Sequence, residues 1–131
     1  MATTHILLPV LPVETITTNS GGTRYFNYYA PTIGYVTEAE AQCSIPKCRV
    51  KRFTARVTTN EVTSITMTLM KNGVSTGLSL SWGAGETGTK TVTGDIAFEQ
   101  QDTYSIRYTW TQTSGSKTTA SYNGVIEYGN Y

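Results

Sequence analysis

Acidic side chains are the groups whose types and spacing come nearest to a reactive site in this chain. Glu99 and Asp102 stand three residues apart in the predicted turn between Phe98 and Tyr104, and Asp95 lies just before them. Two carboxylates that face each other across a cleft can hydrolyse a glycoside. The other interpretation is that Glu99 and Asp102 are solvated loop acids and that Asp95 stabilises a turn. We favour this second interpretation, and we predict no catalytic residue and no enzymatic activity.

Nucleophilic catalysis and metal binding lack the partners that they need. The sole histidine, His5, lies near the N-terminus, and no Gly-x-Ser-x-Gly elbow is present, so a serine triad has no base. A zinc site takes about four ligands. Cys43 and Cys48 are therefore interpreted as reduced thiols, and a small disulfide loop is the alternative. The glycines at 83, 85 and 88 match Gly-x-Gly-x-x-Gly, but a strand follows them instead of a phosphate-binding helix. No cofactor and no metal are expected.

Composition excludes further classes of function. The 131 residues include 10 basic and 9 acidic side chains, which gives a formal net charge of +1, and only 15% of the residues are charged. Nucleic-acid binding through phosphate neutralisation needs clustered cations, and no apolar run is long enough to span a membrane. The first Lys or Arg is Arg24 and prolines interrupt the apolar stretch before it, so no signal peptide is expected. The 25 threonines, 12 glycines and 9 tyrosines favour a single β-rich domain.

Strand periodicity begins at about residue 45. The segments 52–58, 64–69, 76–82 and 104–110 alternate apolar side chains on one face with polar ones on the other, and Asn72-Gly73 is a strong hairpin signal. Six to eight strands at this spacing predict an all-β sandwich or barrel in which each strand has one wetted face. We expect the core to contain the aromatic rings of Trp82, Tyr104, Tyr108 and Trp110. The alternative is that these rings form a binding platform on an open sheet face.

Residues 1–42 follow no long helical or strand period and predict an extended N-terminal arm. Pro9, Pro12 and Pro31 favour an extended path. An extended apolar arm cannot bury itself, so we expect it to lie on its own domain or on a neighbouring subunit. The β domain is expected over residues 43–131, and it should stay folded when the arm is deleted.

Two groups of side chains are candidates for a protein interface. One is an aromatic group in the arm, because a tyrosine ring buries a large area at a low entropic cost; the alternatives are that these rings cap the end of the barrel or stack on a sugar. The other is a basic group that could contact an acidic partner surface or could be a solvated edge strand. The predicted interface residues are Tyr25, Phe26, Tyr28, Tyr29, Tyr35, Arg49, Lys51 and Arg52.

The order of the segments over about residues 45–128 resembles a known group of proteins. The likeness is carried by Leu69-x-Lys71-Asn72-Gly73, the Gly94-Asp95 turn and the closing strand at 124–128. In these features the chain is similar to the short jelly-roll domains of virion surface proteins: capsid decoration or cement proteins, turrets and fibre heads. In outline it also resembles the trimeric heads of the tumour necrosis factor and complement type. The resemblance implies an antiparallel jelly-roll β-sandwich and homotrimers, and it carries over no catalytic residue.

The resemblance further implies a structural virion protein, a capsid decoration or cement protein that forms homotrimers and binds the capsid shell. Its partners would be copies of itself and the major capsid protein or another virion protein, with no nucleic acid and no membrane. The protein would be made in the host cytoplasm and located on the virion surface. The alternative function is a fibre or receptor-binding head that recognises a glycan through Tyr and Trp rings.

Overall fold

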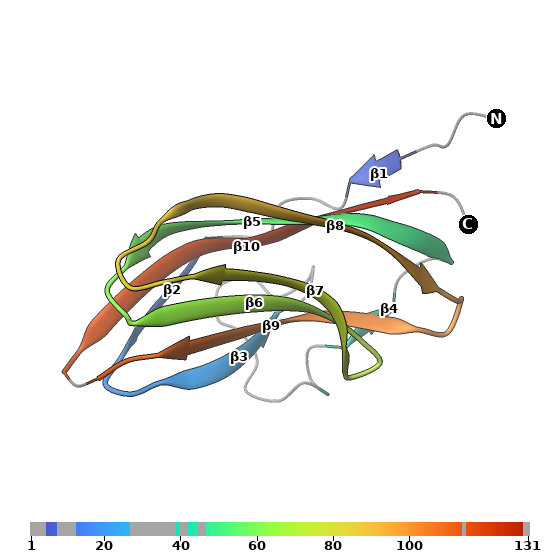
Figure 1. Ribbon diagram of the computed structural model, residues 1–131. Coiled ribbons are helices and arrows are strands. Elements are labelled where there is room, and N and C mark those ends of the chain that lie inside the picture. The colour runs from blue at the N-terminus through green and yellow to red at the C-terminus, as the bar shows by residue number, and fades with distance from the viewer. Residues whose placement is uncertain are drawn as a thin grey trace.

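The computed structural model describes residues 5–7, 13–26, 39, 42–44, 47–113 and 115–129. Among these residues no helix is long and apolar enough to cross a membrane. The described part of the chain forms ten strands (Figure 1). They are β1 (His5–Leu7), β2 (Val13–Thr18), β3 (Gly22–Phe26), β4 (Cys43–Ser44), β5 (Cys48–Asn60), β6 (Ser64–Lys71), β7 (Val74–Trp82), β8 (Gly88–Phe98), β9 (Thr103–Thr111) and β10 (Lys117–Gly129).

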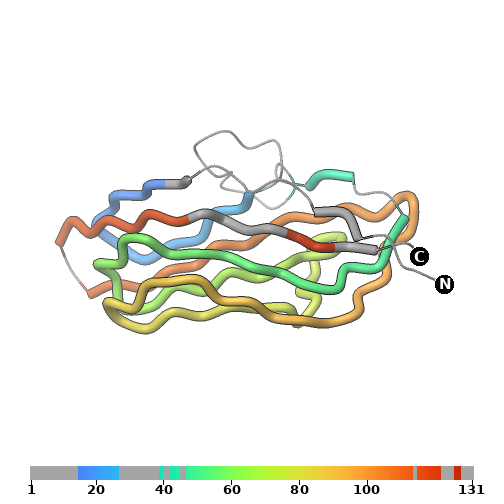
Figure 2. Tube along the Cα trace, turned by 90° about the horizontal axis from the view of Figure 1, so that it is seen from above, coloured from blue at the N-terminus to red at the C-terminus, as the bar shows by residue number. Residues whose placement is uncertain are grey.

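The strands form two antiparallel sheets. Sheet A has the order β1-β10-β5-β8, with β2 also paired to β10, and sheet B has the order β3-β9-β6-β7, with β4 also paired to β9. Figure 2 shows β10, β5 and β8 side by side above the second sheet. From β4 onward the chain crosses to the other sheet at every connection except the β6–β7 hairpin. This is the strand order of a jelly roll, so the predicted all-β, antiparallel jelly-roll sandwich is confirmed.

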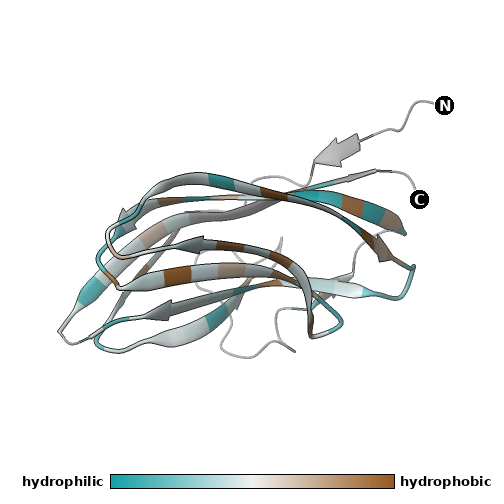
Figure 3. Ribbon diagram, viewed as in Figure 1, coloured by the Kyte–Doolittle hydropathy of each residue, from teal (hydrophilic) through white to brown (hydrophobic). Residues whose placement is uncertain are grey.

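The core lies between the two sheets, where the apolar face of each strand is buried. Brown bands are separated by pale or teal bands along several strands in Figure 3, as a sheet with one buried face requires. Trp82, Tyr108 and Trp110 are each 3% exposed or less. Their polar tips have partners: the Tyr108 hydroxyl donates to Thr119 Oγ1 at 3.0 Å, and the two indole N–H groups donate to backbone carbonyls. The prediction that these rings belong to the core is confirmed, and they cannot serve as an open platform.

The domain boundary expected at residue 42 does not separate the first three strands from the β domain. Strands β1 and β2 pair with β10, and β3 pairs with β9, so these strands complete both sheets of the sandwich. Phe26, at the end of β3, is buried, and its ring lies 5.8 Å from that of Tyr108. Strands of 3, 6 and 5 residues are too short to show a clear period in the sequence. The three prolines of the expected arm lie outside the described residues.

Hydroxyl groups pair across neighbouring strands on the outer faces of both sheets. Thr54 and Thr91 join β5 to β8 with 2.9 Å between their Oγ1 atoms, and Thr23 and Thr109 join β3 to β9 at 3.3 Å. Exposed threonines opposite the core confirm the predicted wetted face on sheet A. On the outer face of sheet B the prediction is wrong for one region, because three of its side chains are buried: Thr68, Met70 and Ser105.

Candidate protein interface

A row of cations crosses the outer face of sheet A at the start of β5. Arg49 donates through Nε to Asp95 Oδ1 at 2.7 Å and through Nη2 to Oδ2 at 3.1 Å, and Lys51 Nζ lies 2.9 Å from the same Oδ1. The register of β5 against β8 shifts between Val50 and Arg52. Lys51 and Arg52, although neighbours in the sequence, therefore both keep accessible side chains, 35% and 51% exposed.

Asp95 remains ionised over almost the whole pH range. The hydrogen bonds from Arg49 and then Lys51 lower the pKa of this carboxyl from 3.8 to about 2. Arg52 forms a separate ion pair with Glu127 at 3.4 Å. Three cations thus stand against two carboxylates, and this part of the face keeps an excess of one positive charge.

Stiff side chains follow the cations along β5 and β8. Threonine is β-branched and holds few rotamers, so its immobilisation at an interface costs less entropy than that of a long side chain. The strand pairing places the cations beside rows of threonine, because Arg52 lies opposite Thr93 and Arg56 lies opposite Thr89. We call this surface the sheet A face: Arg49, Lys51, Arg52, Thr54, Arg56, Thr58, Thr89, Thr91, Thr93 and Asp95.

The aromatic part of the predicted interface lies elsewhere. Phe26 is a core residue, so the prediction that it belongs to an interface is wrong. Tyr25 is half-buried and lies opposite Arg107 on β9, on the outer face of sheet B. The structure therefore places Tyr25 and the basic residues on opposite sides of the sandwich. The other three predicted aromatic residues, Tyr28, Tyr29 and Tyr35, lie outside the described residues.

Sequence reasoning missed the counter-ions of the basic group. Asp95 is 44 residues from Lys51 in the chain, and only the pairing of β5 with β8 brings the two side chains together. Glu127 reaches Arg52 in the same way through the pairing of β10 with β5. The turn predicted at Gly94-Asp95 is wrong, because both residues lie within β8 beside the register shift against β5, and no sequence pattern gives the register between distant strands.

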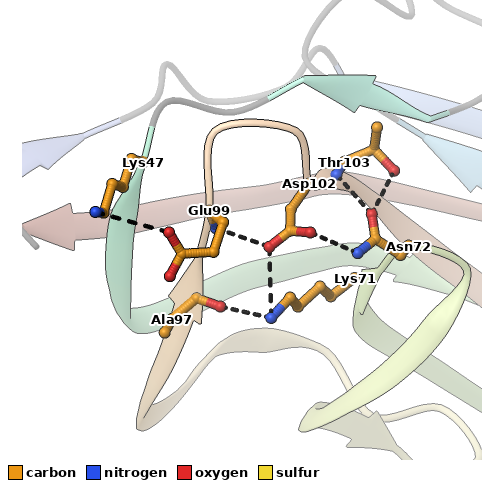
Figure 4. Close-up of polar contacts among 7 residues, drawn as sticks. All are labelled: Lys47, Lys71, Asn72, Ala97, Glu99, Asp102 and Thr103. Atoms are coloured by element: carbon orange, nitrogen blue, oxygen red, sulfur yellow. Dashed lines mark hydrogen bonds and ion pairs between the residues drawn. The ribbon is translucent and has the colours of Figure 1, made fainter.

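Of the carboxylates considered for catalysis, Asp102 holds two turns together (Figure 4). Asp102 accepts hydrogen bonds from the backbone N–H of Glu99 and from Asn72 Nδ2, each at 2.7 Å, and the Asn72 bond is the larger cause of its lowered pKa. Glu99 itself forms an ion pair with Lys47 at 3.7 Å. The general acid of a glycosidase needs a raised pKa. The pKa of Asp102 is shifted in the opposite direction, and its oxygens are engaged within the fold.

Both cysteines are free. Cys43 is half-buried and Cys48 is fully buried, and burial raises the pKa of both thiols, that of Cys48 to about 11. Since the thiolate is the nucleophile and the metal ligand, these groups are poorly suited to either role. In the part of the chain that the structure describes, no three His, Cys, Asp or Glu side chains gather where they could hold a metal ion.

Comparison with known proteins finds a similarity of backbone only. No protein-family model matches the chain, and no curated protein matches its sequence. Among solved structures, the chain is similar to that of the Eiger TNF from S. frugiperda, with a TM-score of 0.46 and 10% sequence identity. The match covers 92% of this chain and 93% of that one. The jelly-roll order described above stands on the strand pairings themselves.

Proposed function

We propose that the chain is a structural virion protein, a capsid decoration or cement protein that forms homotrimers and binds the capsid shell. The observation that carries the proposal is the sheet A face, which combines rows of stiff, exposed threonines with a small excess of positive charge. Such a surface suits association with another protein better than it suits chemistry on a small molecule.

The mechanism of this function is burial of surface. A stable protein interface takes about 800 Å² from each partner. On the sheet A face the hydroxyls remain able to hydrogen-bond to a partner, and their short side chains have little freedom to lose. The cations favour an acidic partner and orient it, which makes binding sensitive to salt. A net charge of +1 leaves little repulsion between copies of the chain.

The glycan-binding alternative has no support among the described residues, and its rings at Tyr28, Tyr29 and Tyr35 lie outside them. It relied on Tyr and Trp rings, and Trp82, Tyr108 and Trp110 are core residues with their polar tips bonded inside the fold. Replacing them would test folding and not recognition. We therefore do not pursue it.

Two measurements test the proposal. Mass photometry at nanomolar to micromolar concentration should show trimers, and a chain that stays monomeric would contradict self-assembly. Co-sedimentation with empty shells of the major capsid protein should retain the wild-type chain in the pellet at low salt and release it as salt rises.

Matched variants assign the contact to a face. The double variant Lys51→Gln/Arg52→Gln leaves Arg49 alone against Asp95 and Glu127, so this part of the sheet A face changes from an excess of one positive charge to an excess of one negative charge, and the variant should lose most of the pelleted protein. The control Arg107→Gln removes a cation from the outer face of sheet B and should still pellet. Thermal unfolding confirms that each variant is folded. Equal binding by both variants would overturn the assignment.

A further inference from the structure

The turn between β6 and β7 is held by its own asparagine side chain (Figure 4). Asn72 and Gly73 both have positive φ, 51° and 80°, which confirms the predicted hairpin turn. The Asn72 carboxamide accepts a hydrogen bond from the Thr103 backbone N–H at 2.9 Å through Oδ1 and donates to Asp102 Oδ1 at 2.7 Å through Nδ2. Its backbone N–H donates to the Thr103 carbonyl at 3.0 Å. One side chain thus ties the β6–β7 turn to the β8–β9 turn.

The same dipeptide is chemically labile. Glycine has no Cβ to hinder its backbone nitrogen, so the nitrogen of Gly73 can attack Cγ of Asn72. A new N–C bond then forms, the Cγ–Nδ2 bond breaks, the Gly73 N–H proton is lost and ammonia leaves. Water opens the resulting cyclic imide at either carbonyl, which gives aspartate or isoaspartate at position 72. No oxidant or reductant takes part.

We propose that the Asn72–Gly73 turn is a site of covalent modification by deamidation, and that Asp102 restrains it in the folded protein. Attack requires the carboxamide to turn so that Cγ faces the Gly73 nitrogen. The bonds to Asp102 and Thr103 hold it toward the β8–β9 turn. Asp102 is well placed for this task, because two hydrogen bonds and Lys71 Nζ at 3.5 Å favour its ionised form.

Deamidation of Asn72 would turn the attractive contact with Asp102 into a repulsive one. The product at position 72 carries a carboxylate where the carboxamide donated, and it would face the Asp102 carboxylate across the former 2.7 Å hydrogen bond. Two like charges at that distance repel. Isoaspartate would also lengthen the backbone inside a tight turn. Deamidation at Asn72 would therefore separate the two turns at this end of the sandwich, and the change is one-way.

The chain supplies an internal reference for the test, because Asn123-Gly124 is the same dipeptide within β10. Wild-type protein and the variant Asp102→Ala are incubated at mildly alkaline pH, and peptide mapping by mass spectrometry follows amide loss at each site. We expect Asp102→Ala to raise the rate at Asn72 by about tenfold or more, which is the ratio that loss of one charge-assisted hydrogen bond allows. The rate at Asn123 should stay unchanged.

Two controls separate restraint from unfolding. Asp95→Ala removes an exposed carboxylate whose partners are Arg49 and Lys51, and should leave the rate at Asn72 unchanged. Asp102→Asn keeps an acceptor oxygen for Asn72 Nδ2 and should deamidate more slowly than Asp102→Ala. The proposal is overturned if Asp102→Ala leaves the rate at Asn72 unchanged. A parallel rise at Asn72 and Asn123 would also overturn it, because modification would then follow global unfolding.

Discussion

At the residue scale, carboxylates hold together parts of this sandwich by hydrogen bonds and ion pairs. Asp95 accepts hydrogen bonds from Arg49 and Lys51, and Asp102 accepts hydrogen bonds from Asn72 and from the backbone N–H of Glu99. Each carboxylate is thereby stabilised in its charged form. These contacts fix how β5 meets β8 and how two turns meet, and so they determine the shape of the surface that a partner would meet.

The ionisation of Asp95 predicts a dependence of stability on pH. Its folded pKa, about 2, lies below its ordinary value of 3.8, so its contribution is fully present above 3.8 and is lost as the pH falls toward about 2. Because the ion pairs are exposed, the effect is small. The thermal unfolding temperature of the wild-type protein should fall more steeply over this pH interval than that of Asp95→Asn. Parallel curves for the two proteins would contradict the assignment.

The bond between Tyr108 and Thr119 joins the two sheets through the core. Both residues are buried, and the hydroxyl groups lie 3.0 Å apart. Tyr108→Phe removes the donor and should lower the free energy of unfolding by about 1 kcal/mol. Urea denaturation of Tyr108→Phe, Thr119→Val and the double variant measures the coupling. Strictly additive effects would show that the contact does not contribute.

At the element scale, the packing of β7 against β8 depends on a missing side chain. A Cβ added at Gly94 on β8 would lie 2.6 Å from Leu78 Cδ2, and Leu78 is buried with little room to move. Gly94→Ala should therefore destabilise the fold by about 1–3 kcal/mol, as overpacking does. Gly83→Ala is the control, since the atom nearest to its added Cβ, Glu86 Oε1, would be 3.9 Å away. Equal stability of the two variants by urea denaturation would refute this account.

Element length explains how much of the fold could be predicted from the sequence. Strands β6 and β9, with 8 and 9 residues, alternate clearly, and the core rings of β9 were predicted. Strands β1 to β3 are short, and what defines them is their pairing with β9 and β10. The same limit applies to the candidate interface: Lys51 and Arg52 were predicted from their own neighbourhood, whereas Asp95 and the threonines beside them required the register of β5 against β8.

At the scale of the whole molecule, the N-terminal strands are part of both sheets. Deleting residues 1–26 removes β1, β2 and β3, takes Phe26 out of the core and exposes the edges of β9 and β10. In contrast to the expectation for a separable arm, the truncated chain should lose its cooperative unfolding transition or aggregate. Circular dichroism and calorimetry test this directly. A soluble fragment with a wild-type transition would contradict the role given to these strands.

The central claim is that the sheet A face is the surface by which this chain binds a capsid shell. A cryo-EM reconstruction of shells of the major capsid protein incubated with the chain tests it most directly. The account predicts trimers of the chain on the shell, with Lys51, Arg52 and the exposed threonines of β5 and β8 in the contact. Bare shells, or bound copies whose sheet A face points to solvent, would contradict it.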